Sequence, residues 1–229
     1  ALSLACPSFH AENLVNETPG QEDKRMEWFH KAKLGIFIHW GIYAVKGVSE
    51  SWSFYNKYLP HDEYLKQCEG FTASKYDPKA WVELIKESGA QYTVLTTKHH
   101  DGVALWDTKQ NGISVVKNTP AKRDLVTPFV NEVRKAGLRL GLYYSLPDWS
   151  HPDYPNMTRT DVRYKDDPKR WDAFCKFNFG QLAELNNTYK PDLYWFDGDW
   201  EMSAETWRAK EIMELLRSTN KDVIVNSRI

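Results

Sequence analysis

Runs of apolar residues alternate with amphipathic stretches along the chain, and this pattern predicts strands and helices in turn. The apolar runs cover residues 34–40, 91–97, 139–146, 193–196 and 223–226. Apolar residues at helical spacing occupy the stretches 78–89, 123–136, 168–189 and 204–218 between them. Strands that alternate with helices predict right-handed β-α-β units and a parallel sheet.

Most of these apolar runs finish in polar or aromatic side chains, such as His39-Trp40, His99-His100 and Asp197. In a (β/α)8 barrel the carboxyl ends of the strands deliver their side chains to one shared face. We therefore predict an α/β fold, a TIM-like (β/α)8 barrel, of which the chain holds about the first five strands. The alternative is a complete five-stranded doubly wound sheet.

The chain is expected to divide into an arm and a barrel. Residues 1–27 are mostly polar and aperiodic, which predicts an extended N-terminal arm. Residues 28–229 are expected to form a catalytic barrel that is incomplete at its C-terminus, because a closed barrel typically needs about 250 residues.

Composition limits the classes of partner. The formal charge of −1 and the pI near 6.7 argue against nucleic acid or an anionic membrane surface. No stretch reaches the about 18–20 apolar residues of a membrane span. Aromatic residues make up 14% of the chain, which favours either a ligand with apolar faces, such as a sugar, or a tryptophan-rich core.

Asp197 is the strongest candidate for chemistry, because it comes directly after an apolar strand and between Trp195 and Trp200. A carboxylate held rigidly there suits the nucleophile of a retaining glycosidase, which needs a second carboxyl about 5–5.5 Å away. Two other interpretations remain open. Asp197-Gly198 is also a common turn signal, and Asp197 with Asp199 forms the DxD pattern of metal-dependent glycosyltransferases.

The His99-His100-Asp101-Gly102 segment is the second candidate. Successive strand residues point to opposite faces, so both histidines can serve one site only if the backbone turns there. The spacing favours hydrogen bonding over metal ligation, and we expect neither a metal nor a cofactor. His39-Trp40 repeats the pairing of a hydrogen-bonding group with a ring, although a core histidine is the alternative.

Five motifs together resemble the α-L-fucosidases of glycoside hydrolase family 29. They lie at residues 35–41, 97–106, 141–149, 195–200 and 225–228, in the order of the family. The resemblance implies a retaining exo-α-L-fucosidase that removes terminal fucose from fucosylated glycans through a covalent intermediate. It also implies a secreted, periplasmic or lysosomal protein.

The resemblance carries roles to particular positions. Asp197 matches the nucleophile, and the histidines match residues that bind the fucose hydroxyls. The matched binding positions are His39, His99, His100, Tyr144 in preference to its neighbour Tyr143, Arg228, Trp52 and Glu50. Trp40 is a further candidate for stacking on the sugar.

Two departures from the family pattern matter. The family's adjacent Glu-Trp pair is interrupted here as Glu50-Ser51-Trp52. The family's acid/base, often a glutamate, lies beyond the arginine that Arg228 matches, so it is expected outside this chain. A non-hydrolytic fucose-binding module therefore stays open as an alternative, beside the DxD glycosyltransferase.

Overall fold

The computed structural model describes residues 17–229, and its centre is one parallel sheet. The strands pair in chain order: β1 (Gly35–Ile38), β2 (Tyr92–Lys98), β3 (Arg139–Ser145), β4 (Leu193–Asp197) and β5 (Ile224–Val225). Sequential pairing of parallel strands is the arrangement of a (β/α) barrel. It excludes the doubly wound alternative, in which the strand order reverses at a switch point.

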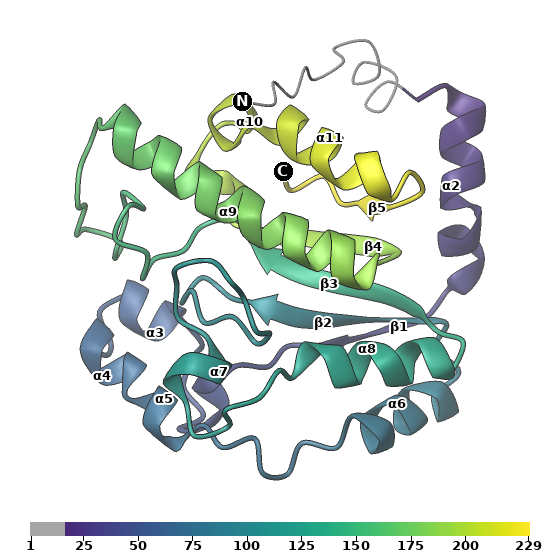
Figure 1. The fold of residues 1–229 in the computed structure, drawn as a ribbon, viewed down its shortest axis with the longest axis horizontal. Coiled ribbons are helices and arrows are strands. Elements are labelled where there is room, and N and C mark those ends of the chain that lie inside the picture. The colour runs from purple at the N-terminus through teal and green to yellow at the C-terminus, as the bar shows by residue number, and fades with distance from the viewer. Residues whose placement is uncertain (1–16) are drawn as a thin grey trace, which may run out of the picture.

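Four helices pack against one face of this sheet (Figure 1). They are α6 (Pro78–Glu87), α8 (Val126–Lys135), α9 (Pro168–Tyr189) and α11 (Ala209–Thr219). Right-handed crossovers between sequential parallel strands place every helix on the same side. In α8, for example, Phe129 and Val133 are fully buried, and they belong to the same apolar core as Leu140 and Leu142 of β3.

The remaining short elements lie in the loops that follow the strands. They are the 3-10 turns Ile42–Ala44 and Asp199–Glu201 and the helices α3 (Trp52–Tyr55), α4 (His61–Leu65), α5 (Gln67–Gly70), α7 (Val115–Asn118) and α10 (Ala204–Trp207). Figure 1 shows α3, α4, α5 and α7 gathered beyond the strand arrowheads. The carboxyl end of the sheet is therefore the end at which loops can build a site.

The two faces of the sheet differ in what they contact. Along β3, Tyr143 belongs to the inner cluster with Val94, Leu193 and Ile224, whereas Tyr144 belongs to the core under the helices. This alternation follows from the period of two along a strand. Of two neighbouring strand residues, only one can therefore face the inner side of the sheet.

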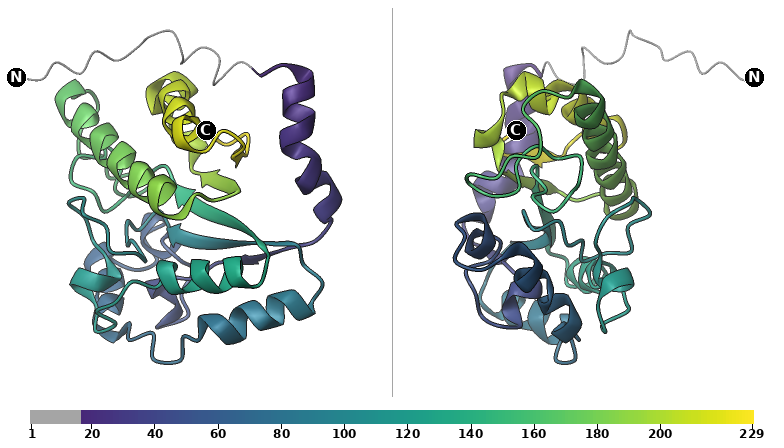
Figure 2. Two further views of the ribbon diagram at one scale, coloured as in Figure 1. Left: turned by 45° about the vertical axis from the view of Figure 1, so that its right-hand side comes forward. Right: turned by 90° about the vertical axis from the view of Figure 1, so that its left-hand side faces the viewer.

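The N-terminal segment differs from the sequence prediction. Residues 1–16 of the predicted arm lie outside the described residues, but α2 (Pro19–Ala32) is helical rather than extended, and it spans the expected boundary after residue 27. Its side chains Met26, Trp28 and Phe29 pack against the inner cluster beside Tyr92. Figure 2 shows α2 apart from the helices of the outer layer. It covers the end of the sheet opposite the loops.

Candidate active site

Asp197, the last residue of β4, lies at the centre of a polar cluster at the carboxyl end of the sheet. Its Oδ2 accepts a hydrogen bond from the Tyr143 hydroxyl at 2.9 Å and lies 3.6 Å from His100 Nε2. Its Oδ1 lies 2.7 Å from Arg228 Nη1, an ion pair without the alignment of a hydrogen bond. The carboxylate is therefore oriented at one oxygen and charge-balanced at the other, with 16% of its side chain exposed.

The turn after Asp197 depends on Gly198. Its φ of +90° is a conformation that side-chain-bearing residues rarely adopt, and a Cβ there would come within 2.2 Å of Pro147 Cδ. The turn brings Asp199 Oδ1 within 3.2 Å of Arg228 Nε. Arg228 thus contacts both acidic residues of the Asp197-Gly198-Asp199 segment, which fixes the cation beside Asp197.

Both histidines of the His99-His100 pair reach the site. The pairing of β2 with β3 shifts register between Thr96 and Lys98, so the alternation of faces is interrupted just before the histidines. The two imidazole rings lie 4.3 Å apart, and His39 from the end of β1 lies 4.7 Å from the His99 ring. The chain then turns at the residues that the sequence indicated, since the Gly102 N–H donates to the His99 carbonyl oxygen at 3.0 Å and Gly102 has φ +77°.

A hydroxyl side chain holds the Nδ1 atom of each histidine. His39 Nδ1 lies 2.9 Å from Thr96 Oγ1, His99 Nδ1 lies 2.7 Å from Ser51 Oγ, and His100 Nδ1 lies 2.5 Å from Ser145 Oγ. Each ring is therefore held at Nδ1, which leaves Nε2 as the nitrogen that can contact other groups.

Burial keeps the three imidazoles neutral. It lowers the pKa of His100 to about 3, with the charges of His39, Lys98 and Arg228 acting in the same direction. Burial, and then the neighbouring histidines, place the pKa of His99 well below its ordinary value. Burial also lowers the pKa of His39, against the opposing charges of Glu50 and Asp197. Neutral rings suit hydrogen bonding to an uncharged ligand.

The structure corrects the choice of tyrosine. Tyr144 faces the outer layer, where its hydroxyl lies 2.8 Å from both Asn178 Oδ1 and Gln181 Oε1 of α9. Tyr143 instead bonds Asp197. The reason is the alternation of side chains along a strand. Tyr143 pairs with Trp195 of β4, and Asp197, two residues after Trp195, lies on the same face of the sheet, so Tyr143 faces Asp197 and Tyr144 does not.

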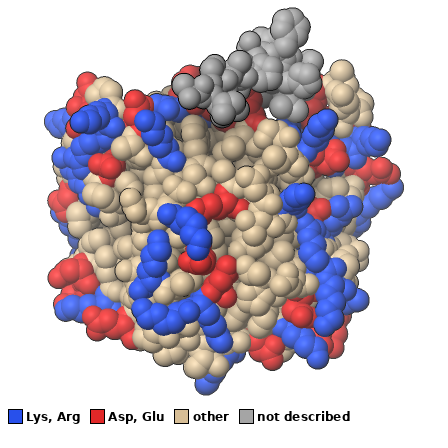
Figure 3. Space-filling view, in the orientation of Figure 1, with Lys and Arg blue, Asp and Glu red and all other residues tan. Residues whose placement is uncertain are grey.

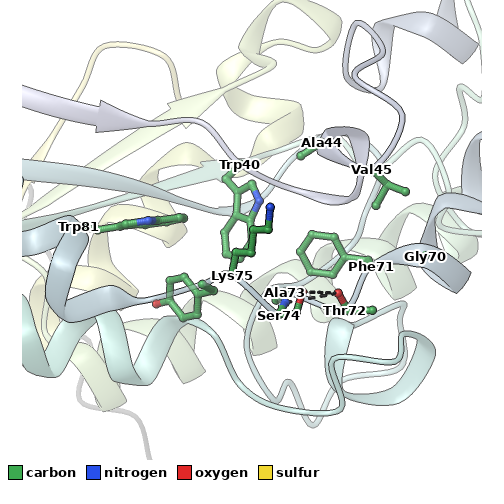
Figure 4. A pocket seen from close by; sticks show the side chains of 11 residues that line it. Trp40, Ala44, Val45, Gly70, Phe71, Thr72, Ala73, Ser74, Lys75 and Trp81 are labelled. Carbon is green, nitrogen blue, oxygen red and sulfur yellow. Dashed lines mark hydrogen bonds between the residues drawn. The ribbon is translucent and has the colours of Figure 1, made fainter.

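Trp40 is also placed away from Asp197. Its ring stacks on Tyr76 with centroids 5.2 Å apart and contacts Trp81 and Phe71 at 5.2 and 5.3 Å. Figure 4 shows Trp40, Phe71 and Trp81 beside a separate pocket, whose volume is about 270 Å³. Since His39 points inward, Trp40 points outward, so its prediction as a sugar-stacking residue is corrected to a packing role.

The loop after β1 contributes Trp52 and Glu50. The Trp52 ring lies 5.7 Å from His100 and stacks on Trp200 at 6.1 Å. Glu50 Oε1 lies 4.0 Å from His39 Nε2, and the residue has φ +35°, a strained conformation for a residue other than glycine. Both side chains therefore lie beside the histidines.

Sequence reasoning did not assign a site role to Trp200, Thr96, Ser51 or Ser145. Trp200 is 47% exposed, and the Arg228 guanidinium lies over its ring, 5.0 Å from the centroid. Its position three residues after Asp197 was a usable signal. The three hydroxyl residues carried no signal of their own, because their role depends on which histidine nitrogen the fold brings to them.

The cluster of His99, His100 and Asp197 has ligand atoms within 4.8 Å of one another, which raises the question of a metal ion. Both carboxylate oxygens of Asp197 are already engaged, by Tyr143 and by Arg228. A guanidinium 2.7 Å from the carboxylate would also repel a divalent cation. The arrangement suits hydrogen bonding to a neutral ligand better than metal ligation.

Similarity to known proteins agrees with this geometry. Residues 5–229 match the family model described as Alpha-L-fucosidase. Tissue alpha-L-fucosidase from Bos taurus is 33% identical over 220 residues, which cover 88% of this chain and 46% of that protein. The Homo sapiens enzyme is 32% identical over 219 residues, with the same coverage of 88% and 46%. The chain spans about half the length of the curated relatives it matches.

Solved structures give the same result. Alpha-L-fucosidase isoenzyme 1 from Paenibacillus thiaminolyticus aligns with a TM-score of 0.82 and 36% identity, over 89% of this chain and 50% of that chain. A GH29 alpha-L-fucosidase from Bacteroides thetaiotaomicron, trapped as a covalent intermediate with 2-fluoro-fucosyl fluoride, aligns with a TM-score of 0.79 and 34% identity, over 90% and 48%. This chain belongs to the alpha-L-fucosidase family, glycoside hydrolase family 29.

Proposed function

We propose that this chain carries the nucleophile and sugar-binding residues of a retaining exo-α-L-fucosidase, within a catalytic unit over residues 28–229. The observation that carries the proposal is the environment of Asp197. The carboxylate is fixed by Tyr143, balanced by Arg228 and faced by His100. The covalent intermediate named for the relative from Bacteroides thetaiotaomicron supports double displacement.

In the first step Asp197 attacks the anomeric carbon of a terminal α-L-fucose. The bond to the leaving oxygen breaks while a general acid protonates that oxygen, and a fucosyl ester forms on Asp197. Water then attacks the same carbon, the former acid takes its proton as a base, and the ester bond breaks with net retention. We assign the acid/base to no residue of this chain.

The residues around Asp197 divide the remaining tasks. The Arg228 guanidinium lies 2.7 Å from Asp197 Oδ1 and balances the charge of the carboxylate, and the Tyr143 bond to Oδ2 leaves Oδ1 as the oxygen without a hydrogen bond. The neutral histidines offer hydrogen-bonding nitrogens to the sugar hydroxyls. Trp52, beside His100, offers a ring for the apolar face of the sugar.

The proposed substrates are fucosylated glycans or glycoconjugates. Acidic and basic side chains are interspersed on the face shown in Figure 3, which suits a largely uncharged ligand. Among residues 17–229, no helix has both the length and the apolar character needed to cross a bilayer. We propose a secreted, periplasmic or lysosomal location, on the basis of the family.

The test is hydrolysis of p-nitrophenyl α-L-fucoside by the natural protein, followed by NMR of the first sugar released. We expect α-L-fucose as the initial product, at a rate that excess EDTA leaves unchanged. Binding of fucose without hydrolysis would instead support the non-hydrolytic module. Loss of activity with EDTA and recovery with Mn²⁺ would support the DxD glycosyltransferase.

Two adjacent tyrosines provide a matched test of the site. Tyr143→Phe removes the hydroxyl that orients Asp197, and we expect kcat for the aryl fucoside to fall about ten-fold or more. Tyr144→Phe removes a hydroxyl on the opposite face, so kcat/KM should stay at the parent value. Because the Tyr144 hydroxyl has buried partners, that variant should lose about 1–3 kcal/mol in the free energy of unfolding.

Steady-state kinetics and urea denaturation of both variants distinguish the two roles. A fall in kcat for Tyr144→Phe with none for Tyr143→Phe would reverse the assignment and restore the original sequence prediction.

A further inference from the structure

His100 lies between a serine and the candidate nucleophile. Its Nδ1 is 2.5 Å from Ser145 Oγ, and its Nε2 is 3.6 Å from Asp197 Oδ2. The ring is fully buried, and Nε2 has no hydrogen-bond partner among the described residues. Which nitrogen carries the proton decides whether His100 donates or accepts at the site.

The single proton of the Ser145 hydroxyl settles this question. Ser145 Oγ lies 2.6 Å from the carbonyl oxygen of Pro147, which is an acceptor only. Because the hydroxyl donates to that carbonyl, it accepts from His100. His100 Nδ1 must then carry the proton, and Nε2 presents a lone pair.

The opposite tautomer is less favourable. With the proton on Nε2, the serine hydroxyl would turn to Nδ1, and two oxygens would face each other at 2.6 Å with no hydrogen between them. The only gain would be a contact of 3.6 Å to Asp197, longer than a hydrogen bond. One of the two short hydrogen bonds is therefore exchanged for a weak contact.

The doubly protonated ring is also disfavoured. It would satisfy both Ser145 and Asp197, but it places a cation in a buried position. Lys98 and Arg228 add repulsion, as does His39 when it is protonated, and among the described residues the Asp197 carboxylate and the neutral His99 ring also face it. Burial and these charges lower the pKa of His100 to about 3.

We propose that Ser145 is a positioning residue that holds His100 as the neutral Nδ1–H tautomer, so that Nε2 accepts a hydrogen bond from a ligand hydroxyl beside Asp197. The consequence for the sugar rests on the proposed function, whereas the tautomer is a property of the protein alone. A ligand group at this position must donate a hydrogen bond to Nε2, which selects a hydroxyl over an ether or carbonyl oxygen. Ser145 thereby contributes to specificity without touching the substrate.

The same argument does not extend to the other two histidines. Thr96 Oγ1 donates to the Ile38 carbonyl at a longer 3.2 Å, and Glu50, 4.0 Å from His39 Nε2, favours a proton on that side. In the part of the chain that the structure describes, Ser51 Oγ is paired with His99 alone. His100 is thus the ring whose tautomer its neighbours determine.

The test begins with imidazole ¹⁵N NMR of the natural protein, with the His100 signals identified by their loss in His100→Gln. We expect a protonated Nδ1 and an unprotonated Nε2 at neutral pH. Ser145→Ala should move the signals toward the Nε2–H tautomer, and Ser145→Thr should restore the parent pattern. Ser150→Ala is the matched control, because Ser150 bonds His61 Nε2 at 2.8 Å in a separate Ser–His pair.

Kinetics provide the second measurement. In Ser145→Ala we expect kcat/KM for p-nitrophenyl α-L-fucoside to fall about ten-fold, with the parent value in Ser150→Ala. A protonated Nε2 in the parent protein would overturn the proposal, whether or not Ser145→Ala folds. An Nδ1–H tautomer in Ser145→Ala equal to the parent's would do the same. A protein with the expected tautomer but no activity on any fucoside would leave the assignment of Ser145 standing and reject the fucosidase.

Discussion

Replacing Asp197 with glycine should reduce the hydrolysis of p-nitrophenyl α-L-fucoside by at least about 10³-fold, the scale on which loss of a catalytic nucleophile acts. Among the described residues, Asp197 is the carboxylate that contacts both Tyr143 and Arg228, and the variant removes it. Without it, no covalent fucosyl ester can form. The measurement is the release of p-nitrophenol by the natural protein and the variant, prepared in parallel.

Azide distinguishes a lost nucleophile from a damaged fold. The small anion can occupy the space that the carboxylate leaves and attack the anomeric carbon from the same face. We expect partial recovery of p-nitrophenol release and a fucosyl azide of inverted configuration. Recovery through a new covalent product is possible only if the rest of the site remains intact.

Asp199→Asn is the matched control for this experiment. Asp199 also contacts Arg228, at 3.2 Å, but within residues 17–229 it forms no hydrogen bond or ion pair with Tyr143 or His100. We expect only a modest fall in rate and no effect of azide. An Asp197→Gly variant as fast as its parent, or one that azide rescues no better than Asp199→Asn, would remove Asp197 from the nucleophile role.

The strands and main helices could be predicted because their signals are local. The helix expected over 168–189 begins and ends at those residues, since Asp167 caps its first turn and Pro168 fits its first position. The five strand runs were continuous enough to be found, and their parallel order followed from the helices between them. Asp197 and the three histidines, which the structure brings together, could be predicted as candidates for the same reason, as polar residues at strand ends.

The errors arose where a single residue step decides the outcome. Tyr143 and Tyr144 are chemically identical, and only the parity of β3 relative to Asp197 separates them. The same alternation directs Trp40 away from Asp197, because the preceding residue, His39, points toward the site. The bulge between Thr96 and Lys98 has no local sequence signature, because it is a property of the pairing of β2 with β3. Long-range register was therefore the missing information.

The helix α2 was missed for a different reason. Its sequence is mostly polar, and only a few side chains, among them Met26, Trp28 and Phe29, pack on the inner cluster. A local signal did exist at its start, where Thr18 and Gln21 form a capping box around Pro19. The periodicity of apolar residues does not reveal such a helix, because only a narrow apolar side packs on the rest of the protein and tertiary contacts supply its stability.

The buried histidine pair should make the fold sensitive to acid. The pKa of His100 is lowered from 6.5 to about 3, and that of His99 lies well below 6.5, in both cases mainly through burial. The unfolded chain binds protons that these folded rings do not. The free energy of unfolding therefore has its full value above about pH 6.5 and decreases as the pH falls below that value. Each ring should contribute about 1.4 kcal/mol per pH unit.

Urea denaturation at a series of pH values, from about pH 8 to about pH 4.5, measures this slope. Below about pH 6 the pair should account for about 2–3 kcal/mol per pH unit, and His100→Gln should remove roughly half of that. At about pH 8 both states hold the ring neutral, so a difference there reports packing alone. Equal slopes in the parent and in His100→Gln would show that His100 titrates alike in the folded and unfolded states. A steep slope would mean that keeping these buried histidines neutral costs the fold stability at acidic pH, where a bound ligand would have to offset the loss.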